Sequence, residues 1–149
     1  MSRATARIAA MQLIYERLSG GEGGENTLQM VYEELREENT RKVNAEDPGM
    51  SDRVWIEKVL SGVLSCQDEL DREISAVSRN WSIERMAKVD LTILRLAVWE
   101  LLHEDDVPGS VVISEAVGMA NCYSGEGSGR FINGILGTIL RAREGGTQA

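Results

Sequence analysis

The chain has 149 residues, the length of one ordinary domain, and its 42% hydrophobic and 27% charged residues are typical of a soluble globular fold rather than a disordered tail or a fibre. Its apolar stretches are much shorter than the about 20 residues that span a membrane, and the N-terminus lacks an apolar signal region, so we expect a cytoplasmic protein. The net charge of −8 excludes a uniformly basic nucleic-acid-binding protein. Two segments, residues 1–15 and 127–143, nevertheless contain arginines and no acidic residue. If these segments lie close together in the fold, they form one positive patch on the surface.

The first predicted helix covers residues 3–19. Apolar residues at three- and four-residue spacing indicate it, and they are Ala4, Ile8, Met11, Tyr15 and Leu18. Ser2 is a suitable N-cap and Gly20 a suitable stop. On a helical wheel Arg3, Arg7 and Arg17 lie along one edge of this stripe, so we expect the three arginines to face solvent together.

Two further helices are predicted before residue 80. A short one covers residues 28–35, and the acidic stretch 37–49 that follows is expected to be mobile. Ser51 then caps a single long helix over residues 51–77. Its apolar face continues for about six turns and consists of Ile56, Val59, Leu60, Val63, Leu70, Ile74 and Val77.

The next predicted elements are a short helical turn over residues 82–89 and a helix over 91–102. Asp90 is expected to cap this helix, which is apolar nearly all round and should therefore lie inside a bundle. Pro108 ends the segment. Residues 111–120 are predicted to be helical; the β-branched start is also compatible with a short strand, but no partner strand is evident.

The last predicted helix covers residues 128–143, with one apolar side. Gly134 and Gly137 lie on its other side. Interior helical glycines cost up to about 1 kcal/mol each relative to alanine. Close approach of another backbone and neutral drift are equally good explanations for them.

No catalytic, metal or cofactor site is indicated by residue spacing. Cys66 and Cys122 are far apart, without a CxxC or Cys/His pattern, and are expected to be buried thiols. His103 is the single histidine and is interpreted as a helix-end side chain. No Ser/His/Asp or Cys/His set stands out, so we do not expect an enzyme.

The segment 125–130 is glycine-rich and precedes the last helix. It lacks the Lys-Ser/Thr pair of a Walker loop and the preceding strand of a dinucleotide-binding loop, so nucleotide binding is not expected. Backbone amides at a helix start attract phosphate of any origin, and Arg130 adds a positive charge. A plain inter-helix loop is the alternative.

Several runs of sequence carry a family resemblance. They are Asn80–Asp90, Ile93–Leu101, Asp106–Pro108, Val112–Ala116 and Ser128–Leu136. In order and spacing these runs resemble the NusB family of bacterial transcription antitermination factors over residues 50–142, and residues 10–15 of the first helix fit as well.

The resemblance implies an all-α, NusB-like bundle of about seven helices in two small subdomains. We expect one domain over residues 1–149, with an N-terminal half over 1–78, a C-terminal half over 79–143 and a flexible tail over 144–149. NusB-like proteins bind the boxA segment of nascent ribosomal RNA together with NusE, a small-subunit ribosomal protein, and help RNA polymerase pass terminators. The family includes monomers and homodimers.

The resemblance also assigns candidate site residues. The RNA-binding set comprises Arg3, Arg7, Ser128, Arg130 and Phe131. The NusE-binding set comprises Arg85, Lys88 and Asp90. For Phe131, stacking on a base and packing in the core are both open.

Departures from the family pattern bear on affinity. Only two arginines stand in the N-terminal stretch, Gly127 replaces a frequent acid, and Gly109 and Ser110 replace a usual Tyr-Lys pair. Weaker RNA binding is expected, since each lost phosphate contact lowers affinity. An acidic adaptor that has lost RNA binding is the alternative function. A second alternative is that the chain is the NusB-like domain of a ribosomal RNA methyltransferase. That alternative would require a cofactor-binding domain after it, and the sequence ends at Ala149.

Overall fold

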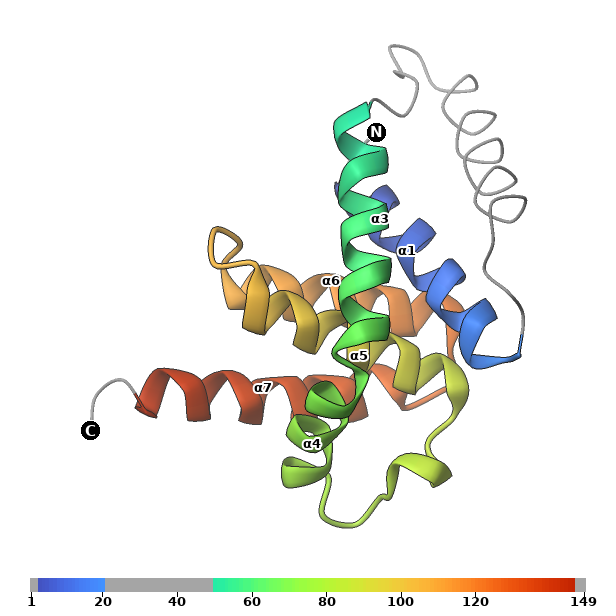
Figure 1. Cartoon of the computed structure of the whole chain (residues 1–149). Coiled ribbons are helices and arrows are strands. Elements are labelled where there is room, and N and C mark those ends of the chain that lie inside the picture. The colour runs from blue at the N-terminus through green and yellow to red at the C-terminus, as the bar shows by residue number, and fades with distance from the viewer. Residues whose placement is uncertain (1–2, 21–49, 147–149) are drawn as a thin grey trace. The chain divides into compact units, whose positions relative to one another are not determined.

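The computed structural model describes residues 3–20 and 50–146, and every regular element in them is helical (Figure 1). The elements are α1 (Arg3–Leu18), α3 (Met50–Ser65), α4 (Gln67–Val77), the 3-10 turn η1 (Ile83–Arg85), α5 (Lys88–His103), α6 (Gly109–Tyr123) and α7 (Ser128–Gly146). The all-α fold class is confirmed. The helix predicted over 28–35 and the acidic stretch 37–49 lie outside the described residues. Among the described helices, none combines the length and hydrophobicity that crossing a membrane requires.

The chain divides into two compact units, Met1–Leu64 and Ser65–Ala149. The division precedes α4, because α4 packs against α5 and α7, whereas the sequence places the boundary between the two halves near residue 78. The prediction of one continuous helix over 51–77 is wrong. The chain breaks at Cys66, which is the N-cap of α4. The apolar spacing conceals this break because Val63 and Leu70 lie seven residues apart, as in an unbroken helix.

In the first unit, α1 begins and ends within a residue of the prediction, but its buried face is different. The residues that α1 buries are Ala6, Arg7, Ala9, Ala10, Met11, Leu13 and Ile14. Tyr15, placed on the apolar stripe, is 39% exposed. Small alanine side chains permit close packing, so the helix buries its alanine-rich face. The expectation that Arg7 faces solvent beside Arg3 is consequently wrong, because Arg7 is only 3% exposed.

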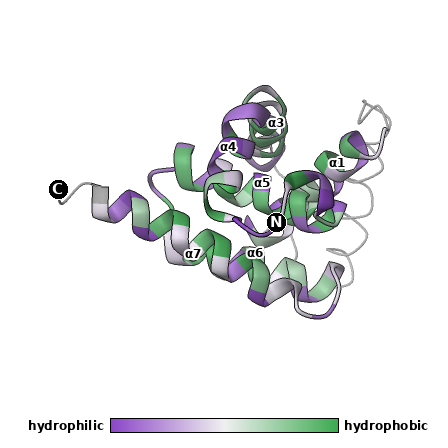
Figure 2. Cartoon of the chain, turned by 90° about the horizontal axis from the view of Figure 1, so that it is seen from below, coloured by the Kyte–Doolittle hydropathy of each residue, from purple (hydrophilic) through white to green (hydrophobic). Residues whose placement is uncertain are grey.

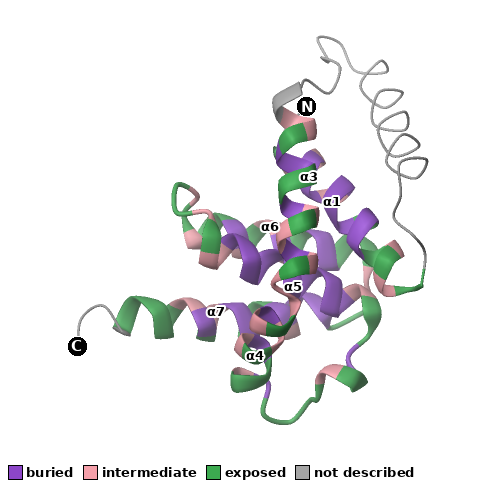
Figure 3. Cartoon of the chain, in the orientation of Figure 1, coloured by how far each residue is buried: buried purple, intermediate pink, exposed green. Residues whose placement is uncertain are grey.

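In the second unit, α5 forms the core, as predicted. Every residue from Asp90 to Glu100 is buried, and Figure 3 shows this helix buried along most of its length. Helices α5, α6 and α7 run back and forth against one another (Figure 1). Helix α7 is amphipathic, with hydrophobic and hydrophilic positions alternating along it (Figure 2). Residues 111–113 are helical, which settles the choice between helix and strand.

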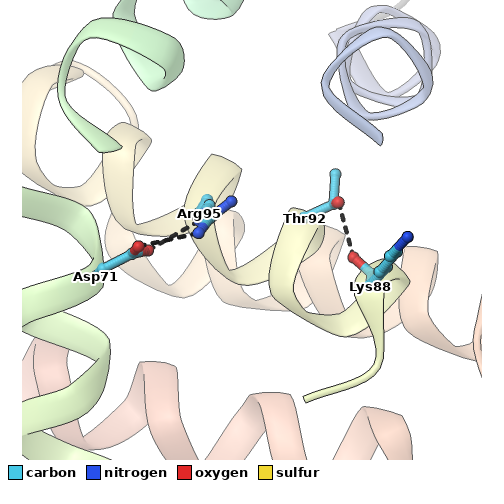
Figure 4. A network of polar contacts seen from close by, with 4 residues as sticks. All are labelled: Asp71, Lys88, Thr92 and Arg95. Atoms are coloured by element: carbon cyan, nitrogen blue, oxygen red, sulfur yellow. Dashed lines mark hydrogen bonds and ion pairs between the residues drawn. The ribbon is translucent and has the colours of Figure 1, made fainter. Parts of the chain in front are cut away.

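Two polar side chains in the α5 core are satisfied internally (Figure 4). The Arg95 guanidinium donates from Nε to Asp71 Oδ1 at 2.8 Å and from Nη2 to Asp71 Oδ2 at 2.9 Å. The Thr92 hydroxyl donates to the Lys88 carbonyl at 2.8 Å. The two-pronged Arg95–Asp71 pair therefore fastens α4 to α5.

The glycines that allow close approach are not those expected on α7. Gly134 has open space around it, and a Cβ at Gly137 would meet only Arg141 of the same helix. Close approach occurs instead at Gly109, where a Cβ would lie 2.5 Å from Leu140 Cδ1, and at Gly129, where it would lie 2.5 Å from Asn121 Oδ1. These two glycines let α6 and α7 pack tightly at both ends.

The cysteines are not the buried thiols that were expected. Cys66 is half-buried at the α3–α4 break, and Cys122 is exposed near the end of α6. Their positions at or near helix ends explain the exposure, since the core is filled by the interiors of the helices.

Candidate nucleic-acid interface

Asp90 joins the beginning of α5 to the loop between α6 and α7. The Ser124 hydroxyl donates to Asp90 Oδ1 at 2.5 Å, and the Ser128 hydroxyl donates to Asp90 Oδ2 at 3.2 Å. The two serine oxygens lie 3.0 Å apart. Asp90 is 8% exposed and is the third residue of α5, whose N-cap is Ala87. The predicted capping role of Asp90 is wrong, because its carboxylate holds the loop serines.

A surface pocket of about 260 Å³ opens beside this network. Its lining residues are Trp81, Arg85, Met86, Ala87, Asp90, Glu126, Gly127, Ser128 and Phe131. They come from the segment before α5, the first turn of α5, the α6–α7 loop and the first turn of α7. Four residues predicted from the sequence thus share one pocket: Arg85 and Asp90 from the NusE-binding set, and Ser128 and Phe131 from the RNA-binding set.

Two aromatic rings form part of the pocket wall. Trp81 and Phe131 meet edge to face, with ring centroids 6.4 Å apart and an interplanar angle of 73°. Trp81 is 53% exposed, and Phe131 is half-buried. An exposed tryptophan leaves a large apolar face in water, which is a feature of binding surfaces. Trp81 is not among the site residues predicted from the sequence, although its position before a short polar turn was the available signal.

The charges around the pocket are mixed. Arg85, Lys88 and Arg130 are exposed, whereas Asp90 and Glu126 place carboxylates in the pocket lining. The pocket itself is therefore suited to a flat apolar group with polar edges. The exposed arginines are better suited to bind phosphate than the pocket lining is.

At the N-terminal end of α7, fewer backbone N–H groups are available to bind phosphate than the sequence predicts. Ser128 N–H donates to the Gly125 carbonyl at 3.2 Å, and Phe131 N–H donates to the Gly127 carbonyl at 3.1 Å. Gly127 has φ +88°, a left-handed conformation that glycine adopts without strain. The loop geometry therefore presents the Ser128 and Phe131 side chains, and phosphate attraction at this helix start depends more on Arg130.

In the first unit, two of the three arginines of α1, Arg3 and Arg7, lie near Trp55 of α3. The guanidinium carbon of Arg3 is 4.4 Å from the Trp55 ring centroid, and that of Arg7 is 5.9 Å from it. Arg3 is exposed, while Arg7 is buried and already has an interaction partner. Of the two, Arg3 has the accessible positive charge. Arg3 and Arg130 belong to different units, and a single patch joining them stays a prediction.

Comparison with known proteins extends over nearly the whole chain. The model of the NusB family matches residues 4–141. The transcription antitermination protein NusB of Acetivibrio thermocellus is 40% identical over 143 residues, covering 96% of this chain and 91% of the relative. That of Nitratidesulfovibrio vulgaris is 35% identical over 150 residues, covering 97% and 91%.

Solved structures agree with the sequence relatives. T. maritima NusB has a TM-score of 0.78 at 29% identity, covering 95% of this chain and 92% of that chain. A crystal structure of antitermination factors NusB and NusE in complex with double-stranded RNA has a TM-score of 0.72 at 27% identity, covering 94% and 96%. The helical fold and these relatives define a transcription antitermination factor, not an enzyme. The chain belongs to the NusB family.

Proposed function

We propose that this chain binds the boxA segment of nascent ribosomal RNA jointly with NusE, within an antitermination complex on RNA polymerase. The observation that carries the proposal is the shared pocket, in which residues assigned to RNA and residues assigned to NusE lie side by side. The similar structure of NusB and NusE with double-stranded RNA supports both ligands. Such a role places the protein in the cytoplasm, where RNA polymerase acts.

The pocket residues and Arg130, which does not itself line the pocket, have different roles that follow from their exposure and chemistry. Trp81 and Phe131 offer ring surface on which a base can stack, an interaction of about 1–3 kcal/mol per base. Arg130, exposed at the start of α7, contacts phosphate. Asp90 is too buried for a partner contact of its own and acts as a positioning residue, because it fixes Ser128 beside Phe131.

The other positively charged side chains have separate roles. Arg85 is the last residue of η1 and Lys88 the first residue of α5; both are exposed, and they supply the NusE contact. Arg3 adds a phosphate contact from the first unit, with its guanidinium held against Trp55. Arg7, being buried, supports Trp55 from within the same unit and does not reach phosphate itself.

The phosphate contacts are tested by binding of fluorescently labelled boxA RNA, with and without NusE, across a salt series. Arg130→Ala is expected to weaken binding and to make the log-affinity against log-salt slope shallower by about 0.7, the value for one contact on single-stranded RNA. Arg143→Ala, which changes an exposed arginine in a distant turn of α7, is the matched control and should leave the slope unchanged.

The stacking role is tested in the same assay. Phe131→Leu and Trp81→Leu should each weaken RNA binding by about 5- to 150-fold, as the loss of 1–3 kcal/mol implies. Tyr123→Leu changes an aromatic side chain that is 46% exposed and does not line the pocket, and it should bind as the unchanged protein does. Full NusE binding without measurable RNA binding would instead support the acidic adaptor, for which the net charge of −8 is the argument.

A further inference from the structure

Three side chains of types that bind metal ions lie close together in the second unit, and none of them lines the pocket described above. Cys66 Sγ, a carboxylate oxygen of Glu69 and an imidazole nitrogen of His103 all lie within 4.8 Å of one another. His103 Nε2 and Glu69 Oε1 are 4.0 Å apart. Sequence spacing alone does not indicate this group, since 34 positions separate Glu69 from His103 and the packing of α4 on α5 brings them together.

We propose that Cys66, Glu69 and His103 form a Zn²⁺ site that links the N-terminal end of α4 to the C-terminal end of α5. Thiolate, imidazole and carboxylate are the three ligand types that zinc takes in proteins. Magnesium and calcium prefer all-oxygen sites, so a sulfur and a nitrogen donor select zinc against them. Because the group holds three protein donors, a water molecule completes a tetrahedral shell.

The geometry needs only a small adjustment. Zinc bonds of about 2.0–2.3 Å at tetrahedral angles place neighbouring donor atoms about 3.3–3.6 Å apart. The separation of 4.0 Å between His103 Nε2 and Glu69 Oε1 must therefore shorten by about 0.4–0.7 Å, and a separation of up to 4.8 Å by no more than about 1.5 Å. The side chains of His103 and Glu69 are 38% and 46% exposed, so they can change rotamer without disturbing the core. Cys66 and Glu69 are three residues apart and so share one face of the first turn of α4.

The surroundings favour a cation at this point. His103 is the last residue of α5, where the helix dipole places partial negative charge. The acidic residues Glu104, Asp105 and Asp106 follow directly. Trp99 lies one turn earlier, with its ring centroid 5.6 Å from that of His103, and restricts the orientation of the imidazole. On zinc binding, the Cys66 thiol releases its proton to the solvent and Sγ binds the metal as thiolate.

The test uses the full, tag-free chain and Co²⁺ as a spectroscopic substitute for Zn²⁺. The unchanged protein should show a saturable near-ultraviolet thiolate-to-cobalt charge-transfer band that Zn²⁺ abolishes by displacement. Cys66→Ser should lose the band. Cys122→Ser, which changes the other and more exposed thiol, should keep it.

The other two ligands are tested by zinc competition with a chromophoric chelator. Glu69→Gln and His103→Gln should each weaken zinc binding at least tenfold, whereas Asp68→Asn, an exposed acid next to Glu69, should not. Helicity measured by circular dichroism confirms that each variant is folded. A cobalt band that persists in Cys66→Ser, or no saturable zinc binding to the unchanged protein up to millimolar metal, would overturn the proposal and leave only a contact between His103 and Glu69.

Discussion

Removing the Asp90 carboxylate should destabilise the second unit and loosen the α6–α7 loop. The carboxylate accepts two hydroxyl hydrogen bonds and is 8% exposed. Hydrogen bonds to a charged group contribute about 1.5–3 kcal/mol each, so the upper limit is about 6 kcal/mol. In the variant, one serine hydroxyl can turn to donate to the other, because the two oxygens already lie 3.0 Å apart. We therefore expect Asp90→Ala to lower the free energy of unfolding by about 2–4 kcal/mol, and Asp90→Asn by about 1–2 kcal/mol because one acceptor remains.

Urea unfolding followed by circular dichroism gives the stability change, and hydrogen exchange of the peptide covering residues 124–128 gives the local effect. Exchange in that peptide should accelerate in Asp90→Ala. Glu126→Gln is the matched control, since it removes a carboxylate from the lining of the same pocket while Glu126 is exposed. It should change stability by no more than about 0.5 kcal/mol.

A double-mutant cycle distinguishes positioning from direct contact with NusE. Asp90→Ala and Ser128→Ala should show a coupling energy of about 1–2 kcal/mol in stability, because they share a hydrogen bond. Additive effects within about 0.5 kcal/mol, together with a loss of NusE affinity in Asp90→Asn at unchanged stability, would refute the positioning role and return Asp90 to the NusE contact.

Three further predictions concern stability, each measured by urea unfolding. Asp71→Asn should lower the free energy of unfolding by about 2–4 kcal/mol, because it leaves the Arg95 guanidinium, whose side chain is 6% exposed, without its ion pair. Asp68→Asn, which changes an exposed residue, should be nearly neutral, and equal effects of the two changes would contradict the link between α4 and α5 through Arg95 and Asp71. Leu94→Ala should cost about 2–5 kcal/mol because Leu94 is fully buried in α5, and a cost below 1 kcal/mol would remove it from the core. Gly127→Ala should cost about 1–2 kcal/mol from its φ of +88°, although a Cβ there meets nothing within 4 Å; a stabilised variant would show that the loop relaxes.

The sequence predicts the helical fold well because its signal is periodic. A helix that is apolar nearly all round predicts that residues 91–102 lie at the centre, and residues from Asp90 to Glu100 are indeed buried. The break at Cys66 is missed because a one-residue interruption with a seven-residue repeat across it leaves the periodicity intact. The burial of Arg7 is missed because alanines, which pack closely, weigh little in a hydrophobic stripe.

For the candidate site too, the sequence predicts individual residues but not the tertiary contacts that bring them together. Local sequence marks Ser128, Phe131, Arg85 and Asp90 through family resemblance, but their meeting in one pocket depends on packing between α5, the α6–α7 loop and α7. The carboxylate of Asp90 could serve a cap, a partner or a distant serine, and sequence spacing does not choose among them. Only contacts across 34 and 38 positions decide in favour of the serines.

The central claim is that this chain recognises boxA RNA jointly with NusE. The most direct measurement compares, at one fixed salt concentration and in the presence of NusE, the affinity for boxA RNA with that for an RNA of the same composition in shuffled order. Non-specific phosphate contacts contribute equally to both RNAs, so a difference reports base recognition. BoxA RNA is expected to bind at least tenfold more tightly than the shuffled RNA, and Phe131→Leu should remove most of this preference. Equal affinities for the two RNAs would contradict the central claim.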